Sequence, residues 1–465
     1  MIDPPHTPPD TLTPATPPPS PGRGRFHIPW LPDDPGLLRS ALNSVAVRAL
    51  GAVALFGSQM VLARVLGVQG YGDYVLALTW VSVLAALAPL GMDSASVRFI
   101  AAYRETGHDA NLTAFLAATR RWAMAGTVVA TVLMAVAVGI VAGHLRPQLL
   151  QVFLWGIAAL PLMGLCQLLA GRLQASRRAV SAIAYQEVLR PLLTVGGVAA
   201  LALLPAAHAG AAAAMVVTAA AAFLSATAMT LHVRPLLPSG PALAARAELR
   251  RDWLGTGLSQ MFTVLAAIAM GQISVLMVGM MAGADQAGIY GAATRVSALT
   301  AFGLGVINPI AGPLFAEAWA GKSRERLAQL ARFSAIAAVL LVIPIALMLG
   351  FGGSRIMAMF GKGFTPGHMA LIFLVLGQTV NAACGSVGLL LNMTGHHHRV
   401  AMVFGVTATV NVVLNFLLIP PFGINGAAAA TGLCMAAWNI ILWVQVRAHL
   451  GIEPSILSIW PRKNA

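Results

Sequence analysis

The stretch LGVQGYGDYVLA (66–77) and the later stretch AGADQAGIYGAA (282–293) share a pattern of glycine and tyrosine. At one constant offset they match at three positions, which pair Gly67 with Gly283, Gly72 with Gly288 and Tyr74 with Tyr290. The same offset places AHAGAAAA (207–214) on GINGAAAA (423–430). Helices rich in glycine and alanine also resemble each other by composition alone, but aligned tyrosine and proline residues at loop junctions favour duplication of one half of the chain.

The composition differs from that of a soluble domain. Of the 465 residues, 58% are hydrophobic and 9% are charged, and the mean hydropathy is +0.79. The apolar runs are continuous, without the alternation of barrel strands, and a helix needs about 20 residues to cross the hydrocarbon layer. We therefore predict an all-α polytopic membrane protein with twelve spans, near 43–64, 74–96, 122–143, 149–170, 180–204, 209–231, 254–281, 289–313, 333–352, 367–391, 400–420 and 425–446.

The formal charge of +14 follows the expected topology. Most arginines and lysines precede the first span or follow an even-numbered one, and the other side carries only Arg64, Arg146, Arg355 and Lys362. This asymmetry predicts that both termini lie in the cytoplasm and that the protein is multi-pass in a bacterial inner membrane. The topology alone explains the basic net charge, so we expect no nucleic acid among the partners of the protein. Asp93, at the inner end of the second span, is expected to pair with Arg98 at the interface.

The spans are expected to form two lobes. Residues 1–36 are rich in proline and predicted to be a disordered cytoplasmic tail. An N-terminal six-helix lobe (37–231), a cytoplasmic linker (232–253), a C-terminal six-helix lobe (254–450) and a cytoplasmic tail (451–465) follow. An even number of spans in each copy makes the repeats parallel, and two such lobes around a central cleft suit alternating access.

Ionised side chains at membrane depth are informative because each costs roughly 2.5–3.5 kcal/mol at the bilayer centre. Arg48 and Arg295, in the first and eighth spans, are expected to face a cavity. Each is close enough to a span end that its side chain could instead extend to the headgroups. Glu187 lies three residues before Arg190, which favours a structural ion pair and leaves a gate or an H⁺- or Na⁺-coupling element as the alternative.

Polar side chains mark further candidate positions in the cavity. Gln59 lies on roughly the same helical face as Arg48, the seventh span carries a polar stripe, and the eleventh span carries two amides on one face. These candidates are Gln59, Thr256, Gln260, Thr263, Asn411 and Asn415. Such groups can hydrogen-bond sugar hydroxyls or join neighbouring helices, and the sequence leaves both alternatives open.

The unpaired charge within the spans is cationic, so the cavity is expected to prefer an anion. Guanidinium groups bind phosphate oxygens in a bidentate manner, which suits a diphosphate held by Arg48 and Arg295. No metal site is expected, because Cys166, Cys384 and Cys434 lie inside spans and His396, His397 and His398 form a compact run in a turn. We also expect no cofactor, and we expect that the protein is not an enzyme.

Three stretches resemble a known family. ARVLGVQGYGDYVLALTWVSVLAALAPLGMDSASVRFIAAYRETG (63–107), MFGKGFTPGHMALIFLVLGQTVNAACGSVGLLLNMTGHHHRVAM (359–402) and NFLLIPPFGINGAAAATGL (415–433) are similar to polysaccharide-biosynthesis flippases of the O-antigen type. These belong to the multidrug/oligosaccharidyl-lipid/polysaccharide exporter superfamily, and the resemblance covers about residues 40 to 450. It implies a MATE-like fold and movement of an undecaprenyl-diphosphate-linked oligosaccharide to the outer leaflet. By position, Arg48 and Arg295 are the implied contacts of the diphosphate.

The expected function is therefore that of a lipid-linked oligosaccharide flippase for surface polysaccharide biosynthesis. Its partners would be the lipid-linked substrate, membrane lipids and polysaccharide-assembly proteins. A lipid II flippase is an alternative, although such proteins usually have two more helices. A cation or drug antiporter is another, although the first and seventh spans lack acidic residues. A glycan polymerase would need a large outer loop with catalytic groups.

Overall fold

The computed structural model describes residues 35–203, 210–238 and 246–456, and within these ranges every regular element is a helix. The proline-rich segment 1–34 lies outside them, as does residue 457 onward. Side chains are not described for 35–49 or for a few positions further on, among them Thr263. The prediction of an all-α polytopic membrane protein is confirmed. Helices satisfy all backbone hydrogen bonds within one segment, which is required where no water is present.

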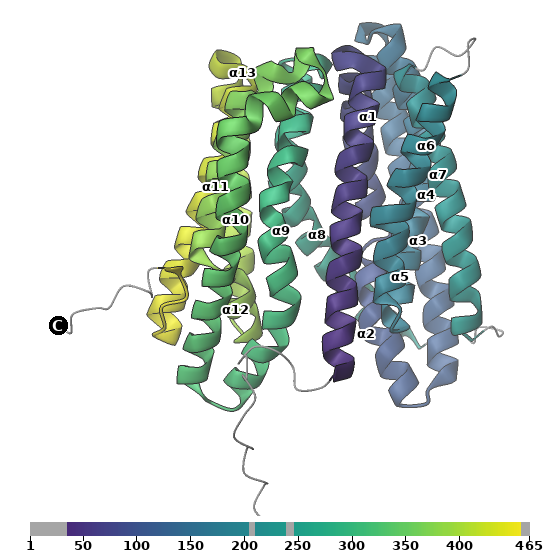
Figure 1. The fold of residues 1–465 in the computed structure, drawn as a ribbon. Coiled ribbons are helices and arrows are strands. Elements are labelled where there is room, and N and C mark those ends of the chain that lie inside the picture. The colour runs from purple at the N-terminus through teal and green to yellow at the C-terminus, as the bar shows by residue number, and fades with distance from the viewer. Residues whose placement is uncertain (1–34, 204–209, 239–245, 457–465) are drawn as a thin grey trace, which may run out of the picture.

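Figure 1 shows the helices in two groups, one purple to teal and one green to yellow. The first group comprises α1 (Pro35–Leu87), α2 (Met92–Glu105), α3 (Asp109–Val141), η1 (Ala142–His144), α4 (Pro147–Ala175), α5 (Ala179–Ile183), η2 (Ala184–Leu189), α6 (Arg190–Ala202), α7 (Ala211–Val233) and η3 (Arg234–Leu236). The second comprises α8 (Ala247–Met281), α9 (Ala284–Ala320), α10 (Arg324–Phe360), η4 (Lys362–Gly367), α11 (His368–Cys384), α12 (Val387–Met393) and α13 (His397–Leu450).

Two glycines interrupt the longest helices. Gly67 in α1 has φ 68° and Gly423 in α13 has φ 56°, values in the left-handed region that favours glycine. The hydroxyl of Tyr71 donates to Oε1 of Gln59 at 3.0 Å. Residues twelve apart in a straight helix would be about 18 Å apart along its axis, so α1 turns back on itself at Gly67. Seven helices among the described residues are long and apolar enough to cross a membrane. At 53 and 54 residues, α1 and α13 are each long enough for two passes, and α5, η2 and α6 run on as one rod, which agrees with the predicted twelve spans.

The two repeated stretches have the same local structure. Gly283, which matches Gly67, also has positive φ (95°) and also precedes a helix that begins a new pass. The Tyr74 hydroxyl shares a hydrogen bond with Thr218 of α7 (2.9 Å), and the Tyr290 hydroxyl shares one with Thr431 of α13 (3.0 Å). These two partner helices are the sixth and twelfth passes. The correspondence supports the duplication, while the lobe boundaries 37–231 and 254–450 stay a prediction.

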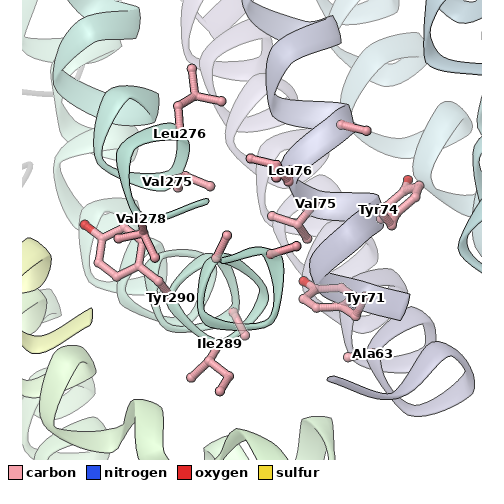
Figure 2. Close-up of a cluster of buried hydrophobic side chains, with 14 of the residues drawn as sticks. Ala63, Tyr71, Tyr74, Val75, Leu76, Val275, Leu276, Val278, Ile289 and Tyr290 are labelled. Carbon is pink, nitrogen blue, oxygen red and sulfur yellow. The ribbon is translucent and has the colours of Figure 1, made fainter. Parts of the chain in front are cut away.

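The two groups meet mainly along α1 and α9. A Cβ atom added to Gly72 would lie 2.2 Å from the carbonyl oxygen of Ala284, and one added to Gly288 would lie 2.7 Å from Cα of Gly72. Figure 2 shows buried apolar side chains around this contact, with Val75 and Leu76 of α1 on one side and α8 and α9 on the other. The repeated glycines therefore allow the two backbones to touch at the centre of the junction.

We predict that Gly72→Ala destabilises the protein. The new methyl group overlaps the backbone of α9, and overpacking of this kind typically costs about 1–3 kcal/mol. Alanine is otherwise the better helix former, so a loss of stability in this variant would be due to the steric clash. Gly57→Ala, in the same helix, is the matched control, because a Cβ added at Gly57 would meet no atom of a neighbouring element within 4 Å. The midpoint of thermal unfolding in detergent should fall for Gly72→Ala only, and equal midpoints would contradict the close contact.

Candidate functional site

Arg295 lies at the junction of the two helix groups. Its side chain, on α9, is half-buried, and its guanidinium carbon lies 5.9 Å from the ring centroid of Tyr71 in α1. Nη1 donates to the carbonyl oxygen of Gly291 at 3.1 Å. Tyr71 is buried and is itself fixed by its hydrogen bond to Gln59, which is also buried. Arg295 is thus held against α1 by a ring and a carbonyl oxygen.

The positive charge of Arg295 is not neutralised locally. Among the described side chains no carboxylate forms an ion pair with it. Among the described residues Nη1 donates to Gly291 and the guanidinium also interacts with the Tyr71 hydroxyl. A guanidinium has five N–H donors, so further donors remain. A half-buried cation without a counter-ion is costly at membrane depth, and an anion bound beside it would offset that cost.

The side chain of Arg48, the second predicted diphosphate contact, lies outside the described residues, although its position belongs to α1. One helical turn later, Gly51 packs against Glu187, whose Cβ would lie 3.0 Å from a Cβ added to the glycine. The first pass therefore lies directly beside η2, the segment that carries Glu187.

Glu187 and Arg190 do not form the favoured ion pair with each other, although both side chains are described. Glu187 lies in η2, a π-helix, and Pro191 in the following turn has no N–H to donate to the carbonyl oxygen of Glu187. The wider π turn changes the directions of side chains relative to an α-helix, so the three-residue spacing no longer brings the two groups together. Their role as coupling or gate residues stays a hypothesis.

A polar cleft opens where α2 and α8 approach each other, at the end of the bundle with the α2–α3 turn, which we call the Arg98 end. It consists of two hollows of about 760 and 390 Å³ that share Ser94, Arg98 and Gln260. The predicted residues Thr256 and Gln260 line it, together with Ser259. The side chain of Thr263, one turn further along α8, is not described.

Asp93 lies at the inner edge of this cleft, and the expected pairing with Arg98 is wrong. The guanidinium of Arg98 instead lies 5.3 Å from the ring centroid of Phe99. Residues five apart lie on different faces of a helix, so the two charged groups do not pair although both line the smaller hollow. Oδ1 of Asp93 is buried and has no hydrogen-bond partner, and Oδ2 accepts a long hydrogen bond of 3.5 Å from Oγ of Ser94.

Asn411 and Asn415 lie inside the second helix group, where both are fully buried. Nδ2 of Asn415 donates to Oγ of Ser274 at 3.0 Å and to Oδ1 of Asn411 at 3.0 Å. Ser274 also shares a hydrogen bond with Thr431, which Tyr290 contacts. Of the two alternatives for these amides, this geometry favours the joining of helices α8, α9 and α13. Contact with a glycan would require another conformation.

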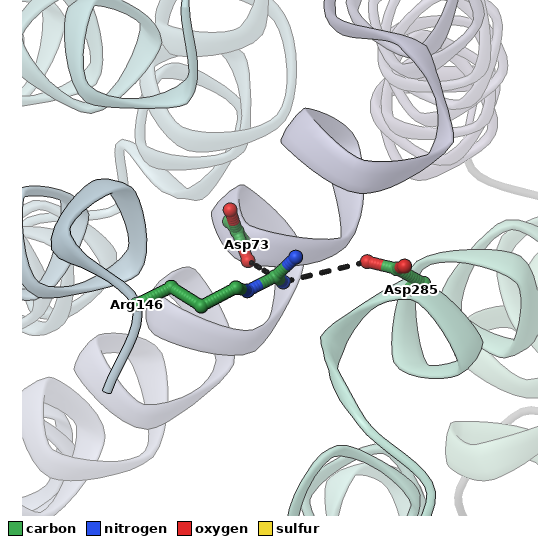
Figure 3. Close-up of polar contacts among 3 residues, drawn as sticks. All are labelled: Asp73, Arg146 and Asp285. Carbon is green, nitrogen blue, oxygen red and sulfur yellow. Dashed lines mark hydrogen bonds and ion pairs between the residues drawn. The ribbon is translucent and has the colours of Figure 1, made fainter. Parts of the chain in front are cut away.

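An ion triad spans the two helix groups at the opposite end of the bundle, which contains Gly67 and Gly283 and which we call the Gly67 end. Nη2 of Arg146 lies 2.9 Å from Oδ1 of Asp73 and 3.4 Å from Oδ1 of Asp285 (Figure 3). Asp73 belongs to α1, Arg146 caps α4, and Asp285 is in the first turn of α9. The Asp73 side chain is only 4% exposed, so it depends on Arg146 for its counter-ion.

Aromatic contacts close the same end. The ring of Tyr71 lies 5.5 Å from that of Phe364 in an edge-to-face arrangement, and Phe56 lies 5.6 Å from Phe360. Nε of Arg64 donates to the carbonyl oxygen of Met359 at 2.6 Å. The ion triad, these rings and the Gly72 contact together join the two groups at the Gly67 end.

Sequence reasoning missed the ion triad and the glutamines of the cleft. Asp73 and Asp285 stand beside the repeated glycines, a signal that could have been used, but Arg146 is far from both in the sequence. Gln167, Gln174 and Gln186 lie on α4 and η2 and enter the cleft only through helix packing.

The model of the family described as polysaccharide biosynthesis protein matches residues 37–319. The chain is also 28% identical over 176 residues to a protein of Haloferax volcanii named "Probable low-salt glycan biosynthesis flippase Agl15". That alignment covers 36% of this chain and 36% of the relative, so the chain matches little more than a third of the relative's length.

Several solved structures have the same fold. An inward-facing multidrug resistance MATE family transporter of the MOP superfamily has a TM-score of 0.69 at 13% identity, over 88% of this chain and 98% of the other. The lipid II flippase MurJ in an inward closed conformation has a TM-score of 0.68 at 12% identity, over 87% of each chain. An outward-facing MATE transporter has a TM-score of 0.61 at 13% identity, over 89% and 96%.

We predict that Arg146→Gln opens the Gly67 end. The change removes the one described ion pair that crosses between the groups, Arg146–Asp285. A loss of about 1 kcal/mol, the upper range for partly exposed pairs, would shift the balance between closed and open states about fivefold. Nitroxide labels at Gly143→Cys and Lys362→Cys report the separation of the two groups by double electron–electron resonance. The native cysteines are buried, which favours labelling of the introduced ones.

Arg355→Gln is the matched control for this measurement. It removes the same charge from an exposed arginine of α10 that belongs to no described ion pair. The distance distribution should gain a longer component for Arg146→Gln and stay unchanged for Arg355→Gln. Identical distributions for the two variants would show that the ion triad does not hold this end closed.

Proposed function

The chain belongs to the polysaccharide biosynthesis protein family, and on this premise we propose that it is a flippase and not an enzyme. Its cargo would be a polyprenyl-diphosphate-linked oligosaccharide, moved across the bacterial inner membrane for surface polysaccharide biosynthesis such as O-antigen or exopolysaccharide assembly. The name of the Haloferax volcanii relative and the fold shared with MurJ and MATE transporters support this proposal.

Arg295 is the single observation on which the proposal depends most. It is a half-buried cation between the two helix groups, fixed by Tyr71 and Gly291, with free guanidinium donors and without a described carboxylate partner. A diphosphate offers several charged oxygens to such a group, and charge-assisted bidentate contacts are the strongest hydrogen bonds available here. In this proposal Arg295, together with Arg48, binds the diphosphate while the polyprenyl chain stays in lipid.

We infer that the Arg98 end faces the cytoplasm together with both termini, as the distribution of basic residues indicates. The closed Gly67 end would then face outward. Higher TM-scores with the inward-facing and inward closed structures (0.69 and 0.68) than with the outward-facing one (0.61) support this assignment. The cargo would enter at the Arg98 end and leave after the ion triad separates.

The remaining candidates have subordinate roles in this proposal. Gln59 positions Arg295 through Tyr71, and Thr256 and Gln260 line the entry cleft. Asn411 and Asn415 stabilise the second helix group, with Thr263 next to the cleft by sequence position. Glu187 and Arg190 are the candidates for coupling to H⁺ or Na⁺ or for gating, because the π-helix places them next to the first pass.

We predict that Arg295→Ala abolishes most transport. In proteoliposomes, the substrate is fluorescently labelled undecaprenyl-diphosphate-N-acetylglucosamine, and dithionite quenching reports its leaflet. Hydrogen bonds to a charged group are worth about 1.5–3 kcal/mol, so the initial rate should fall roughly 10- to 100-fold. Arg295→Lys keeps the charge but loses the bidentate geometry, so its rate should be intermediate. Arg48→Ala should act in the same direction.

Arg355→Ala serves as the control, because it removes an exposed arginine that belongs to no described ion pair. It should transport at the wild-type rate, with equal protein content in all vesicles. Wild-type transport by Arg295→Ala would contradict the proposal. Faster efflux of a fluorescent dye with no lipid movement would instead favour a drug antiporter. Rescue of a strain depleted of its lipid II flippase would favour a lipid II flippase.

A further inference from the structure

The polar cleft at the Arg98 end contains an unusual concentration of amides. Gln167 and Gln174 of α4, Gln186 of η2 and Gln260 of α8 all line its smaller hollow, together with Asp93 and Arg98 of α2. We call this set of residues the glutamine cleft. The four glutamines come from three elements, so no single helix face explains their gathering.

The amides have unused hydrogen-bonding groups. Nε2 of Gln186 donates to Oε1 of Gln167 at 3.1 Å and more weakly to the carbonyl oxygen of Cys166. The Gln167 amide nitrogen and the Gln186 amide oxygen stay available, and the side chains of Gln174 and Gln260 form no hydrogen bond to the described residues. The cleft therefore presents both donors and acceptors at several points.

The carboxylate of Asp93 adds a strong acceptor. Its Oδ1 atom is buried without a hydrogen-bond partner, in a position where burial of an unpaired polar atom is unfavourable. Close packing fixes this position, because a Cβ added to Gly171 of α4 would lie 2.2 Å from the carbonyl oxygen of Asp93. A ligand that donates a hydrogen bond to Oδ1 would satisfy an atom that the protein leaves unpaired.

The charge of the cleft disfavours an anionic ligand at this point. The two hollows are lined by the guanidiniums of Arg98 and Arg251 and by the carboxylates of Asp93, Glu248 and Asp252. Carboxylates outnumber guanidiniums, and Arg98 stacks on Phe99. A ring of amides around one unpaired carboxylate matches a ligand with many hydroxyl groups and no negative charge, whereas the diphosphate of the cargo is better placed at Arg295.

We propose that the glutamine cleft is a sugar subsite that selects uncharged or amino sugars over hexuronates. Asp93 accepts from a hydroxyl or ammonium group of a cargo sugar at the Arg98 end, before the diphosphate reaches Arg295, and the glutamine amides bind the neighbouring hydroxyls. The inference rests on the proposed flippase function and adds the class of glycan. The glutamine cleft has a volume of about 390 Å³, which is in the usual range for small-molecule sites. It shares lining residues with the neighbouring hollow of about 760 Å³.

The test compares two cargo probes in the same proteoliposomes, undecaprenyl diphosphate carrying either N-acetylglucosamine or glucuronate. The wild-type protein should move the N-acetylglucosamine probe about tenfold faster, because the glucuronate carboxylate meets Asp93. Asp93→Asn keeps the shape and removes the charge, so the rate with the glucuronate probe should rise several-fold while that with N-acetylglucosamine falls. A gain of transport cannot result from misfolding. Asp109→Asn, an exposed carboxylate at the start of α3, should leave both rates unchanged.

The outcomes separate this inference from the proposed function. If the wild-type protein moves neither probe, the proposed function fails and the subsite fails with it. If it moves both, but the ratio of rates is the same in wild type and Asp93→Asn, the flippase assignment stands and the sugar subsite is wrong. A second variant, Gln174→Leu, should slow the N-acetylglucosamine probe more than the glucuronate probe, and equal slowing of both would also overturn the proposal.

Discussion

The close contact of two glycines at the centre of the molecule constrains everything else in the structure. Gly72 of α1 and Gly288 of α9 have no side chains, so the helix backbones approach to a distance that any Cβ would prevent. Small residues are the usual means of helix association in lipid, where burial of apolar surface gives little driving force. Because the two positions are equivalent in the repeat, each half of the chain supplies the same surface to the other. Tyr71, Tyr74, Tyr290 and Arg295 all lie on the two helices that this contact joins.

The two ends of the bundle differ in chemistry around that fixed centre. The Gly67 end is joined by the ion triad and by aromatic rings, whereas the Arg98 end is lined by amides and separated charges. The groups also touch near the Arg98 end, where a Cβ added to Gly91 would lie 2.0 Å from the carbonyl oxygen of Gly257. Glycine contacts without side chains let helices rotate against each other with few interactions to break. The ion triad adds one ion pair between the groups, Arg146–Asp285, which must break when this end opens.

Several features could be predicted because they depend on local pattern. Apolar length gave the twelve passes, the matching glycines and tyrosines indicated a repeat, and membrane-depth charge directed Arg295 to a protein-facing position. Other features depend on helix rotation and packing, which a single sequence does not encode in a readable form. Asp93 and Arg98 are close in sequence but point to different neighbours. The glutamine cleft combines four amides that lie up to 93 positions apart in the chain, from Gln167 to Gln260. Asn411 and Asn415 have side chains of the kind that bind sugars, but their hydrogen bonds in the structure join helices of the second group.

The distribution of unpaired charge connects these observations. An unpaired ion or buried polar atom lowers stability, so a fold that keeps one needs a compensating interaction or a function that uses it. Here Arg295, a cation without a carboxylate partner among the described residues, lies at the junction of the halves, and the unpaired carboxylate oxygen of Asp93 lies in a separate hollow. One cargo can satisfy both in turn, as it passes from one end to the other, only if it carries negative charge in one part and hydrogen-bond donors without negative charge in another. A diphosphate joined to a neutral or amino sugar has this arrangement, whereas a simple anion or a cationic drug can satisfy only one of the two sites.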